Sequence, residues 1–242
     1  MDHPALLADL ELAQQVQQSL LPAHRQSLHG WKVDFAFEPF AHVSGDYVDI
    51  ISGPQSFHFL LGDVSGKGVA ASMLMSHLHA TMRALLSTDL PLEQVVAAAS
   101  RAFCHSSLPA QFATLLIGRA DRNGSVELLN AGHTPLIYSS AAAVHILPAG
   151  NIPLGLFCES RFAATRLAVS SGDTLLLHTD GITESCNADG EEFGVERLQS
   201  SFAAALQQAP DTLISHIRRD LAAFTSETSP PDDLTLLTLQ RT

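Results

Sequence analysis

The spacing of apolar residues changes from helical to alternating within the first quarter of the chain. Leu12, Val16 and Leu20 recur four positions apart, which predicts a helix over residues 5–21 that ends at Pro22. The period then changes: apolar and polar residues alternate over 33–37, and two further segments have the composition of strands. The strands expected in this part of the chain cover residues 33–37, 47–51 and 57–64.

Paired helices and a run of strands are expected in the remaining three quarters. Residues 69–86 lack Gly and Pro and predict a buried helix with residues 73–75 in the core, and a second helix runs from 92 to about 105. The later elements are strands at 111–118, 125–130, 135–139, 144–147, 162–169 and 174–179, helices at 195–208 and 211–225, and a last strand at 234–240. Strands joined by short turns, such as the hairpin turn at 121–124, predict an α+β fold with two antiparallel sheets covered by helix pairs. No internal repeat or long linker divides the chain.

Composition and charge exclude several classes of protein. The chain has 242 residues, of which 46% are hydrophobic and 16% charged, and this balance is globular rather than disordered. The formal net charge of −12 disfavours nonspecific binding to nucleic acid and to anionic lipid. No apolar run approaches the roughly 18 residues that a membrane helix needs, so membrane insertion is not expected.

The N-terminus and the cysteines indicate a cytoplasmic protein. The first residues carry Asp2, Asp9 and Glu11 and lack the basic start of a secretory signal. The three cysteines are scattered, odd in number and without CxxC spacing: Cys104, Cys158 and Cys186. We therefore expect reduced thiols, with neither a disulfide framework nor a zinc site.

The segment Gly62-Asp63-Val64-Ser65-Gly66-Lys67-Gly68 follows an apolar strand and opens a helix. It does not fit a phosphate-binding P-loop, because the spacing is one residue short and Gly68 stands where Ser or Thr is required. It does fit the G-x-G-x-x-A pattern of dinucleotide-binding proteins, but no second strand with an acidic end follows, so an oxidoreductase is a distant alternative. Asp63 is either a helix cap or a metal ligand, and this motif alone leaves both open.

Other side chains near this motif were weighed for catalysis. Ser65, Lys67 and Arg83 are candidates for phosphate contact, although a lysine in such a turn is more often solvated. A serine hydrolase is disfavoured because Ser65 lacks the GxSxG pattern, and no HExxH zinc motif is present.

Three further acidic motifs share the arrangement of Asp63, in which a carboxylate stands beside a glycine or a second carboxylate at the end of an expected strand. They contain Asp46, Asp180 and the pair Asp232 and Asp233. Taken singly, each is explained by a tight turn or a solvated acidic loop. Strand ends can converge in a sandwich, however, and carboxylates gathered there would raise one another's pKa unless cations neutralise them. All-oxygen ligands suit Mg²⁺, Mn²⁺ or Ca²⁺, and two such ions about 3.5–4 Å apart can activate water and hold a phosphoryl group.

These motifs belong to an ordered series of segments along nearly the whole chain. The segments are Ala13-x-x-Val16-Gln17-x-x-Leu20-Leu21-Pro22, Val43-Ser44-Gly45-Asp46-Tyr47-x-Asp49, Gly62 to Gly68, Ala113-Thr114-Leu115, Asn130-Ala131-Gly132-His133-Thr134-Pro135, Pro153-Leu154-Gly155, Gly172-Asp173, Thr179-Asp180-Gly181-Ile182-Thr183-Glu184, Phe193-Gly194 and Asp232-Asp233-Leu234-Thr235. The series resembles the PPM-type (type 2C-like) serine/threonine phosphatases, specifically the bacterial RsbU/SpoIIE branch. One segment would be weak evidence, whereas the ordered series is highly specific.

The resemblance implies a four-layer αββα sandwich with two divalent cations, Mn²⁺ or Mg²⁺, between the sheets. By motif match Asp63 should bridge both ions, and the Val64 carbonyl should face one of them. Asp180 and Asp232 should complete the shell of one ion, and Asp46 should serve the other. The implied reaction is in-line attack on phosphorus by a metal-activated water, without a phosphoenzyme.

Small departures from the family pattern affect only details. Asp233 ranks below Asp232 as a ligand, because relatives often carry Asn or Asp at this position. Ser44 replaces the commoner first glycine of the Gly-Gly-Asp turn, which should alter backbone freedom without removing a ligand. The phosphate-binding arginine of eukaryotic relatives has no clear equivalent. Every expected acidic ligand is present, which argues against an inactive phosphatase.

The resemblance also implies a domain division and partners. Residues 1–22 would form a regulatory or linker-like helix, and residues 23–242 the catalytic domain. The implied substrate is a phosphorylated STAS-domain protein, an anti-sigma-factor antagonist in a partner-switching pathway. An upstream sensor or receiver domain or an activator would act through the N-terminal helix and the helix at 69–87, and the N-terminal helix would be the contact of a homodimer. The alternative is a catalytically weak or inactive module that keeps the fold and binds a regulatory partner.

Overall fold

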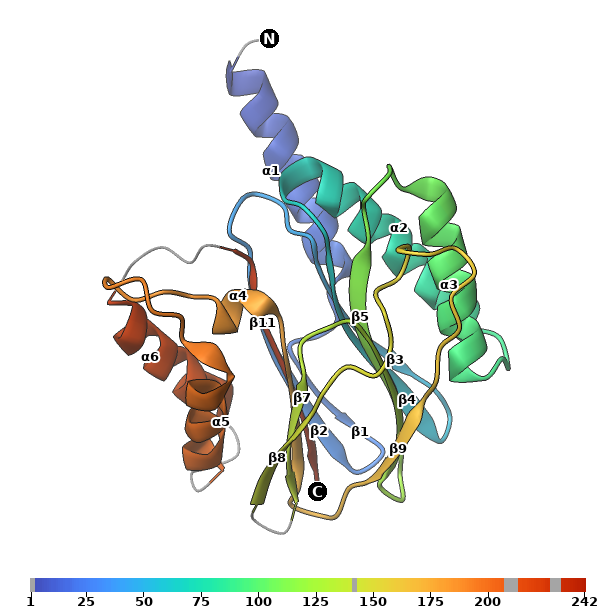
Figure 1. Ribbon diagram of the computed structural model, residues 1–242, viewed down its shortest axis with the longest axis vertical. Helices are drawn as coiled ribbons and strands as arrows, with labels where there is room; N and C mark the ends of the chain where they lie inside the picture. Colours follow the sequence, from blue (N-terminus) through green and yellow to red (C-terminus); the bar gives the residue numbers. More distant parts are fainter. Residues whose placement is uncertain (1–2, 141–142, 207–212, 227–231) are drawn as a thin grey trace.

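The computed structural model describes residues 3–140, 143–206, 213–226 and 232–242. Two antiparallel sheets lie face to face, and helices cover the outer side of each sheet (Figure 1). The expected α+β class, with four layers in the order αββα, is therefore confirmed.

Each sheet combines strands from distant parts of the chain. The six-stranded sheet has the order β1 (Arg25–Leu28), β2 (Trp31–Glu38), β11 (Leu234–Arg241), β10 (Thr174–His178), β7 (Leu136–Ser140) and β8 (Ala143–Leu147). The five-stranded sheet has the order β3 (Asp46–Ser52), β4 (Ser56–Val64), β5 (Ala113–Asp121), β6 (Ser125–Ala131) and β9 (Thr165–Ala168). The C-terminal strand β11 thus pairs with β2 from the start of the chain, which closes the fold.

Two helix pairs cover the sheets, and one helix projects beyond them. α2 (Gly68–Leu86) and α3 (Leu92–Ser106) pack on the five-stranded sheet, whereas α5 (Gly194–Ala205) and α6 (Leu213–Thr225) pack on the six-stranded sheet. The short α4 (Asp180–Thr183) follows β10, and α1 (His3–Leu20) extends past one end of the sandwich (Figure 1). Among the helices of the described residues, none is long and apolar enough to cross a membrane.

Strand β4 shows how the sequence pattern builds the layers. Phe57, Phe59 and Leu61 point toward the six-stranded sheet, whereas Leu60 between them points toward α2 and α3. All four side chains are fully buried, because a central strand of a sandwich buries both of its faces. Gly118 lies opposite Phe59 on β5, where an added Cβ would come within 2.1 Å of the Phe59 ring, so only glycine fits.

Most expected elements are present, with differences in three short segments. β9 covers only the second half of the expected strand at 162–169, and β1 and α4 were not expected. Each of these elements is four residues long, which is too short for a period of 2.0 or 3.6 residues to stand out. Residues 207–208 and 211–212, at the ends of the two expected C-terminal helices, lie outside the described residues.

The expectation that Met73 lies in the core is wrong. Helix α2 buries one stripe, Ala71, Met75, Leu78 and Met82, at spacings of three and four residues. Met73 lies off this stripe, and 68% of its surface is exposed. The buried face of α2 is thus narrower than expected from the many apolar residues in its sequence.

The expectation of three reduced thiols is also wrong. Cys104 of α3 and Cys158 of the β8–β9 connection form a disulfide, with Cα atoms 5.5 Å apart. The connection returns to α3 because Leu154 bridges to Ala113 at the start of β5 and Gly155 lies against Phe103. Spacing along the sequence cannot reveal a pairing of this kind, and the argument for a cytoplasmic location loses the support that it drew from the cysteines.

Candidate metal centre

Five aspartates from both sheets gather at one end of the sandwich. Asp46 begins β3 and lies opposite Asp63 in the register of β3 and β4. Asp180 follows β10 as the first residue of α4, and Asp232 and Asp233 immediately precede β11, the neighbour of β10. Figure 1 shows α4 beside the start of β11. The convergence of strand ends expected from the sequence is therefore present.

The carboxylates lie close enough to perturb one another electrostatically. Burial raises the pKa of Asp63, and the charges of Asp180, Asp232 and Asp233 raise it further, to about 8, against the opposing charge of Lys67. A cluster of this kind is unfavourable without a counter-charge, because each ionised carboxylate disfavours the ionisation of the others. Divalent cations are the most direct way to supply that charge.

Asp46 is oriented by two threonines of the opposite sheet. Thr179 Oγ1 donates to Asp46 Oδ2 at 3.0 Å, and Thr235 Oγ1 donates to the same oxygen. Thr179 Oγ1 also accepts the Thr235 N–H at 3.0 Å, so the two threonines are fixed relative to each other. Burial, followed by the Asp63 charge, raises the pKa of Asp46 well above its usual value, although both threonine hydrogen bonds lower it. Both threonines stand within the acidic motifs of the sequence, but no pattern there indicates that they bind Asp46.

Asp180 is held close to Asp232 by direct backbone packing. A Cβ on Gly181 would lie 2.1 Å from the Asp233 carbonyl oxygen, so α4 can approach the chain before β11 only because this residue is glycine. Burial, and then the neighbouring Asp232, raises the pKa of the Asp180 carboxyl. The Asp-Gly pair at this point begins a short helix and is not a hairpin turn.

Asp233 fixes the loop that leads into β3. Its Oδ1 accepts the Phe40 N–H at 2.8 Å, and its Oδ2 accepts the Ser44 hydroxyl at 2.6 Å and the Gly45 N–H at 3.0 Å. Both carboxylate oxygens thus bind protein donors. These contacts are those of a positioning residue, and metal ligation by Asp233 stays a prediction of lower rank than ligation by Asp232.

Lys67 neutralises part of the cluster. Its Nζ lies 2.7 Å from Asp232 Oδ2 and 5.7 Å from the centre of the Phe40 ring. Within the part of the chain that the structure describes, no three His, Cys, Asp or Glu side chains form a group that could hold a metal ion as they lie. Asp232, Asp46 and Asp233 are instead each in contact with protein donors, namely Lys67, two threonines and the loop at 40–45.

The residues nevertheless fit hard divalent cations. The donor set consists of carboxylate and carbonyl oxygens, which Mg²⁺ and Mn²⁺ prefer. Gly45 leaves the approach open, because a Cβ there would lie 3.0 Å from the Val64 carbonyl oxygen and 3.2 Å from Asp63 Oδ1. The Val64 carbonyl therefore faces the same space as the Asp63 carboxylate, as its expected role requires.

The other candidates for phosphate contact have partners within the protein. Ser65 Oγ accepts the Phe112 N–H at 2.9 Å, which braces the chain after Asp63. Arg83 binds both oxygens of Asp49, each at 2.8 Å, and therefore lies in a buried ion pair away from the carboxylate cluster. Phosphate contact by Ser65 or Lys67 remains a prediction.

A buried histidine supports Asp63 from between the sheets. His133 Nδ1 lies 2.8 Å from Thr114 Oγ1, which in turn donates to the Asp63 carbonyl at 3.4 Å. Burial, and then the neighbouring His178, lowers the pKa of His133 to about 3, so its ring is neutral at physiological pH. Its place in the motif Asn130 to Pro135 was the only signal in the sequence.

Replacing Lys67 by methionine is expected to tighten Mn²⁺ binding about tenfold. The ammonium group competes with a cation for Asp232, and methionine keeps the length of the side chain without the charge. Isothermal titration of the metal-free protein with Mn²⁺ measures the change. The only other lysine, Lys32 on β2, offers the matched control, since Lys32→Met should leave the affinity unchanged. Weaker binding in Lys67→Met would show that Lys67 supports the site and does not compete for it.

Comparison with known proteins identifies similar sequences and folds. Residues 53–242 match the family model described as Stage II sporulation protein E (SpoIIE). The chain is 27% identical to Protein IcfG of Synechocystis sp., covering 96% of this chain and 41% of that protein. It is 24% identical to phosphoserine phosphatase RsbU of Bacillus subtilis, covering 97% of this chain and 70% of RsbU.

A solved structure has the same fold over nearly the full length. The SiaA-PP2C domain of Pseudomonas aeruginosa superposes with a TM-score of 0.85 at 19% identity, and the match covers 99% of each chain. The similarity thus includes α1 as well as the sandwich. The chain spans less than half the length of IcfG, so the properties of that whole protein do not transfer directly.

Proposed function

The chain belongs to the SpoIIE family of PPM-type phosphatases, and we propose that it hydrolyses phosphoserine or phosphothreonine in a small partner protein with two divalent cations, Mn²⁺ or Mg²⁺. The observation that carries this proposal is the gathering of Asp46, Asp63, Asp180 and Asp232 from both sheets at one end of the sandwich. A buried carboxylate with a pKa near 8 indicates a site that needs cationic charge.

Each residue has a separate task in the proposed site. Asp63 lies beside the other carboxylates and would bridge two ions, Asp180 and Asp232 would complete the shell of one ion, and Asp46 would serve the other. The ions, when bound, would supply an activated water and stabilise charge on the phosphoryl group during in-line displacement.

The protein contributes the orientation of these ligands. Thr179 and Thr235 hold the Asp46 carboxylate across the two sheets. Asp233 fixes residues 40–45, so that Gly45 faces the Val64 carbonyl. Lys67 would move from Asp232 toward the substrate phosphate once a cation takes its place.

The proposed substrate is a phosphorylated STAS-domain protein in a partner-switching pathway of the cytoplasm. The name of the relative RsbU, a phosphoserine phosphatase, supports the phosphoserine part of this proposal. Phe40 beside Lys67 and Val69 and Met73 on the first turns of α2 are exposed apolar side chains, which suit contact with a protein surface.

Helix α1 is proposed to regulate the site. Leu12 and Val16, four residues apart on one face of this helix, are exposed, and so are Leu6 and Leu7 nearer its start, which suits a homodimer contact or an upstream sensor or receiver domain. Gln17 connects α1 to the metal centre: its side-chain amide donates to the Ser44 carbonyl at 2.8 Å and accepts the Ser44 N–H at 2.9 Å. A rotation of α1 would therefore displace the loop at residues 40–45, which Asp233 binds and which leads directly into Asp46.

A non-catalytic binding module is the second candidate. The contact between Lys67 and Asp232 favours it, because this ion pair stabilises the cluster partly without metal. The two functions differ in their dependence on the carboxylates, since only a phosphatase needs them for turnover.

Hydrolysis of p-nitrophenyl phosphate across Mn²⁺ and Mg²⁺ titrations tests the proposal. We expect turnover that saturates with metal and disappears with EDTA. Asp180→Asn should abolish it, whereas Asp189→Asn on a nearby exposed turn should not. Absence of turnover at saturating metal, with the protein folded, would contradict the phosphatase and favour the binding module.

A further inference from the structure

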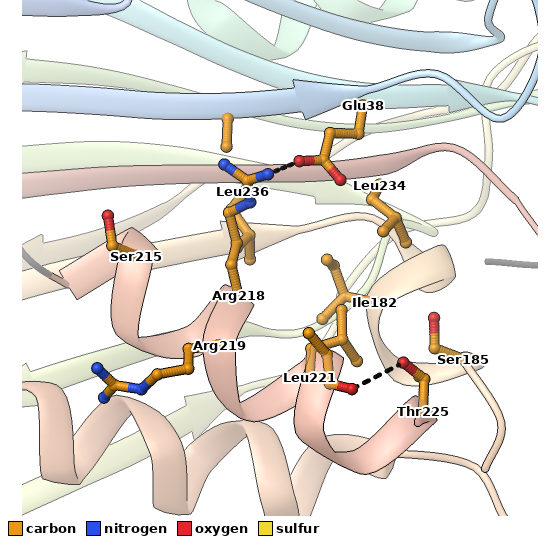
Figure 2. Close-up of a pocket in the computed structure, with 12 residues that line it drawn as sticks. Glu38, Ile182, Ser185, Ser215, Arg218, Arg219, Leu221, Thr225, Leu234 and Leu236 are labelled. Carbon is orange, nitrogen blue, oxygen red and sulfur yellow. Dashed lines mark hydrogen bonds and ion pairs between the residues drawn. The ribbon is translucent and has the colours of Figure 1, made fainter. Parts of the chain in front are cut away.

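A cavity of about 410 Å³ lies between α6 and the six-stranded sheet, outside the carboxylate cluster. Its walls come from β2, β11, α6 and α4 with the turn that follows it (Figure 2). Ala36 on β2 and Ala222 on α6 line it with short side chains, which leaves the space between helix and sheet unfilled. The volume is in the range of small-molecule sites, which is about 300–1,000 Å³.

The inner wall of the cavity is hydrocarbon. Ile182, Leu221 and Leu234 converge in it, with Leu236 behind them (Figure 2). Ile182, Leu221 and Leu236 pack in the buried core under α6 and form the floor of the cavity, whereas Leu234 is half-buried and has surface left for a ligand. Such a wall favours an alkyl chain or another apolar body.

An ion pair stands at the rim of the cavity. Arg218 on α6 binds Glu38 at the end of β2, and both side chains are about half exposed (Figure 2). An exposed ion pair contributes little stability, so the guanidinium can exchange Glu38 for another carboxylate at small cost. Arginine also binds carboxylates through two parallel hydrogen bonds, which favours a single well-defined pose.

Besides Arg218 and Glu38, the lining has four polar side chains, and three of them have partners in the protein, whereas Ser215 is a neutral hydroxyl group that carries no charge to the site. Ser185 Oγ donates to the Gly181 carbonyl at 2.7 Å, and Thr225 Oγ1 donates to the Ala222 carbonyl at 3.3 Å. Arg219 also lines the cavity, but its guanidinium lies 2.6 Å from His216 Nδ1 and, in Figure 2, on the side away from Leu234 and Glu38. Arg218 is therefore the cationic group that the lining offers to a ligand.

We infer that this cavity binds a small amphiphile with one hydrocarbon body and one carboxylate group. The hydrocarbon body packs against Ile182, Leu221 and Leu234. The carboxylate binds Arg218 in place of Glu38, which turns toward solvent.

A ligand in this cavity can affect the metal centre because two short segments contribute residues to both sites. Ile182 follows Asp180 by two residues on α4, and Leu234 comes directly after Asp233. A ligand that contacts both side chains restrains the segments that carry Asp180 and Asp232. This regulatory consequence rests on the proposed function, whereas binding to the cavity does not.

Calorimetric titration of the full chain in EDTA with decanoate tests the binding itself. Decanol and decylamine, which have the same chain and a neutral or cationic head, serve as matched probes. We expect saturable binding of decanoate that is at least about tenfold tighter than binding of either probe. No saturable binding of decanoate, or tighter binding of decylamine, would overturn the inference.

The two halves of the ion pair provide variants with opposite expected effects. Arg218→Gln should weaken decanoate binding about tenfold, whereas Glu38→Gln should tighten it because a competitor for Arg218 is removed. Equal effects of the two variants would contradict the assigned carboxylate contact.

Filling the cavity is the second test of its location. Ala222→Phe should abolish decanoate binding, and Ala223→Phe, on the next residue of α6 and outside the lining, should not. Both alanines are exposed, so both variants should fold, and thermal melting checks this. Retained binding in Ala222→Phe would overturn the site. A Mn²⁺ affinity that is unchanged by decanoate would overturn only its link to the metal centre.

Discussion

Replacing Asp63 by asparagine is expected to lower metal-dependent phosphate hydrolysis at least about a thousandfold. Asp63 lies among the other carboxylates and opposite Asp46, so it is the side chain best placed to contact two ions. Asparagine keeps the shape and one carbonyl oxygen but cannot bridge two cations with charge. A loss of several kcal/mol of transition-state stabilisation corresponds to this factor. Initial rates on p-nitrophenyl phosphate at saturating Mn²⁺ measure the effect.

The same substitution should stabilise the metal-free protein at alkaline pH. The pKa of Asp63 is about 8 in the folded protein against an ordinary value of 3.8, so between these values the folded protein binds more protons than the unfolded chain. Its free energy of unfolding therefore falls as the pH rises through this range, and asparagine removes that contribution. We expect Asp63→Asn in EDTA to be more stable than the wild type at pH values above 8, with a linkage limit of roughly 5 kcal/mol from the difference between the two pKa values, and to differ little from it near pH 4.

Two comparisons separate this prediction from a general effect of mutation. Asp89→Asn, on the exposed turn between α2 and α3, should change neither turnover nor the pH dependence of melting. Saturating Mn²⁺ should stabilise the wild type much more than Asp63→Asn. A variant that keeps its metal-dependent turnover would show that another carboxylate carries the bridge, and the assignment of Asp63 would be wrong.

The layers of the fold could be predicted because long amphipathic elements carry a strong periodic signal. In β4 the apolar run Phe59-Leu60-Leu61 at the end of the segment is typical of a strand, and the structure buries it on both faces, with Phe59 and Leu61 toward the other sheet and Leu60 toward the helices. In β1 and α4 four residues carry no comparable signal, and their structure depends on neighbours that are distant in sequence.

The carboxylate cluster could be predicted because each aspartate stands at the end of a strand. The contacts around the cluster could not be predicted, because the partner of each aspartate comes from a distant segment of the chain. The Lys67–Asp232 ion pair joins residues that are far apart in the chain, and so do the contacts of Asp233 with residues 40–45. The disulfide between Cys104 and Cys158 belongs to the same class. The sequence shows which ionisable side chains are present, but only the tertiary contacts determine which of them face the carboxylate cluster.

The ion pair of Asp49 and Arg83 is another long-range contact that the sequence does not reveal. It connects α2 to β3, the strand that carries Asp46. Asp49 is fully buried, and besides both Arg83 hydrogen bonds it accepts the Ile50 N–H at 2.8 Å and the Tyr47 hydroxyl at 3.3 Å. His79 Nε2 lies 3.7 Å away. Arg83 follows the Gly62 to Gly68 motif in the sequence, which made it a candidate for phosphate contact, but in the structure α2 directs it toward Asp49 of β3.

Replacing Arg83 by methionine is expected to lower the free energy of unfolding by about 3 kcal/mol. The change leaves the Asp49 carboxylate buried without its ionic partner, and losing one member of a buried pair costs about 3–5 kcal/mol. Arg83 itself is 48% exposed, so water can partly replace it, and this places the expected loss at the lower end. Chemical denaturation in EDTA measures the loss, and Arg101→Met on the exposed side of α3 is the control.

The double variant Asp49→Leu with Arg83→Met tests the cause of that loss. Removing the buried charge together with its partner should cost less than Arg83→Met alone, because no unpaired carboxylate remains. A double variant that is less stable than Arg83→Met would show that Asp49 stabilises β3 through its Ile50 and Tyr47 contacts more than through the ion pair.

If the pair also positions α2 beside the metal centre, Arg83→Met should weaken Mn²⁺ binding under conditions where it remains folded. Asp49 lies three residues after Asp46 on β3 and faces α2, whereas Asp46 faces the other sheet, so this coupling would pass through the position of α2, which begins four residues after Val64.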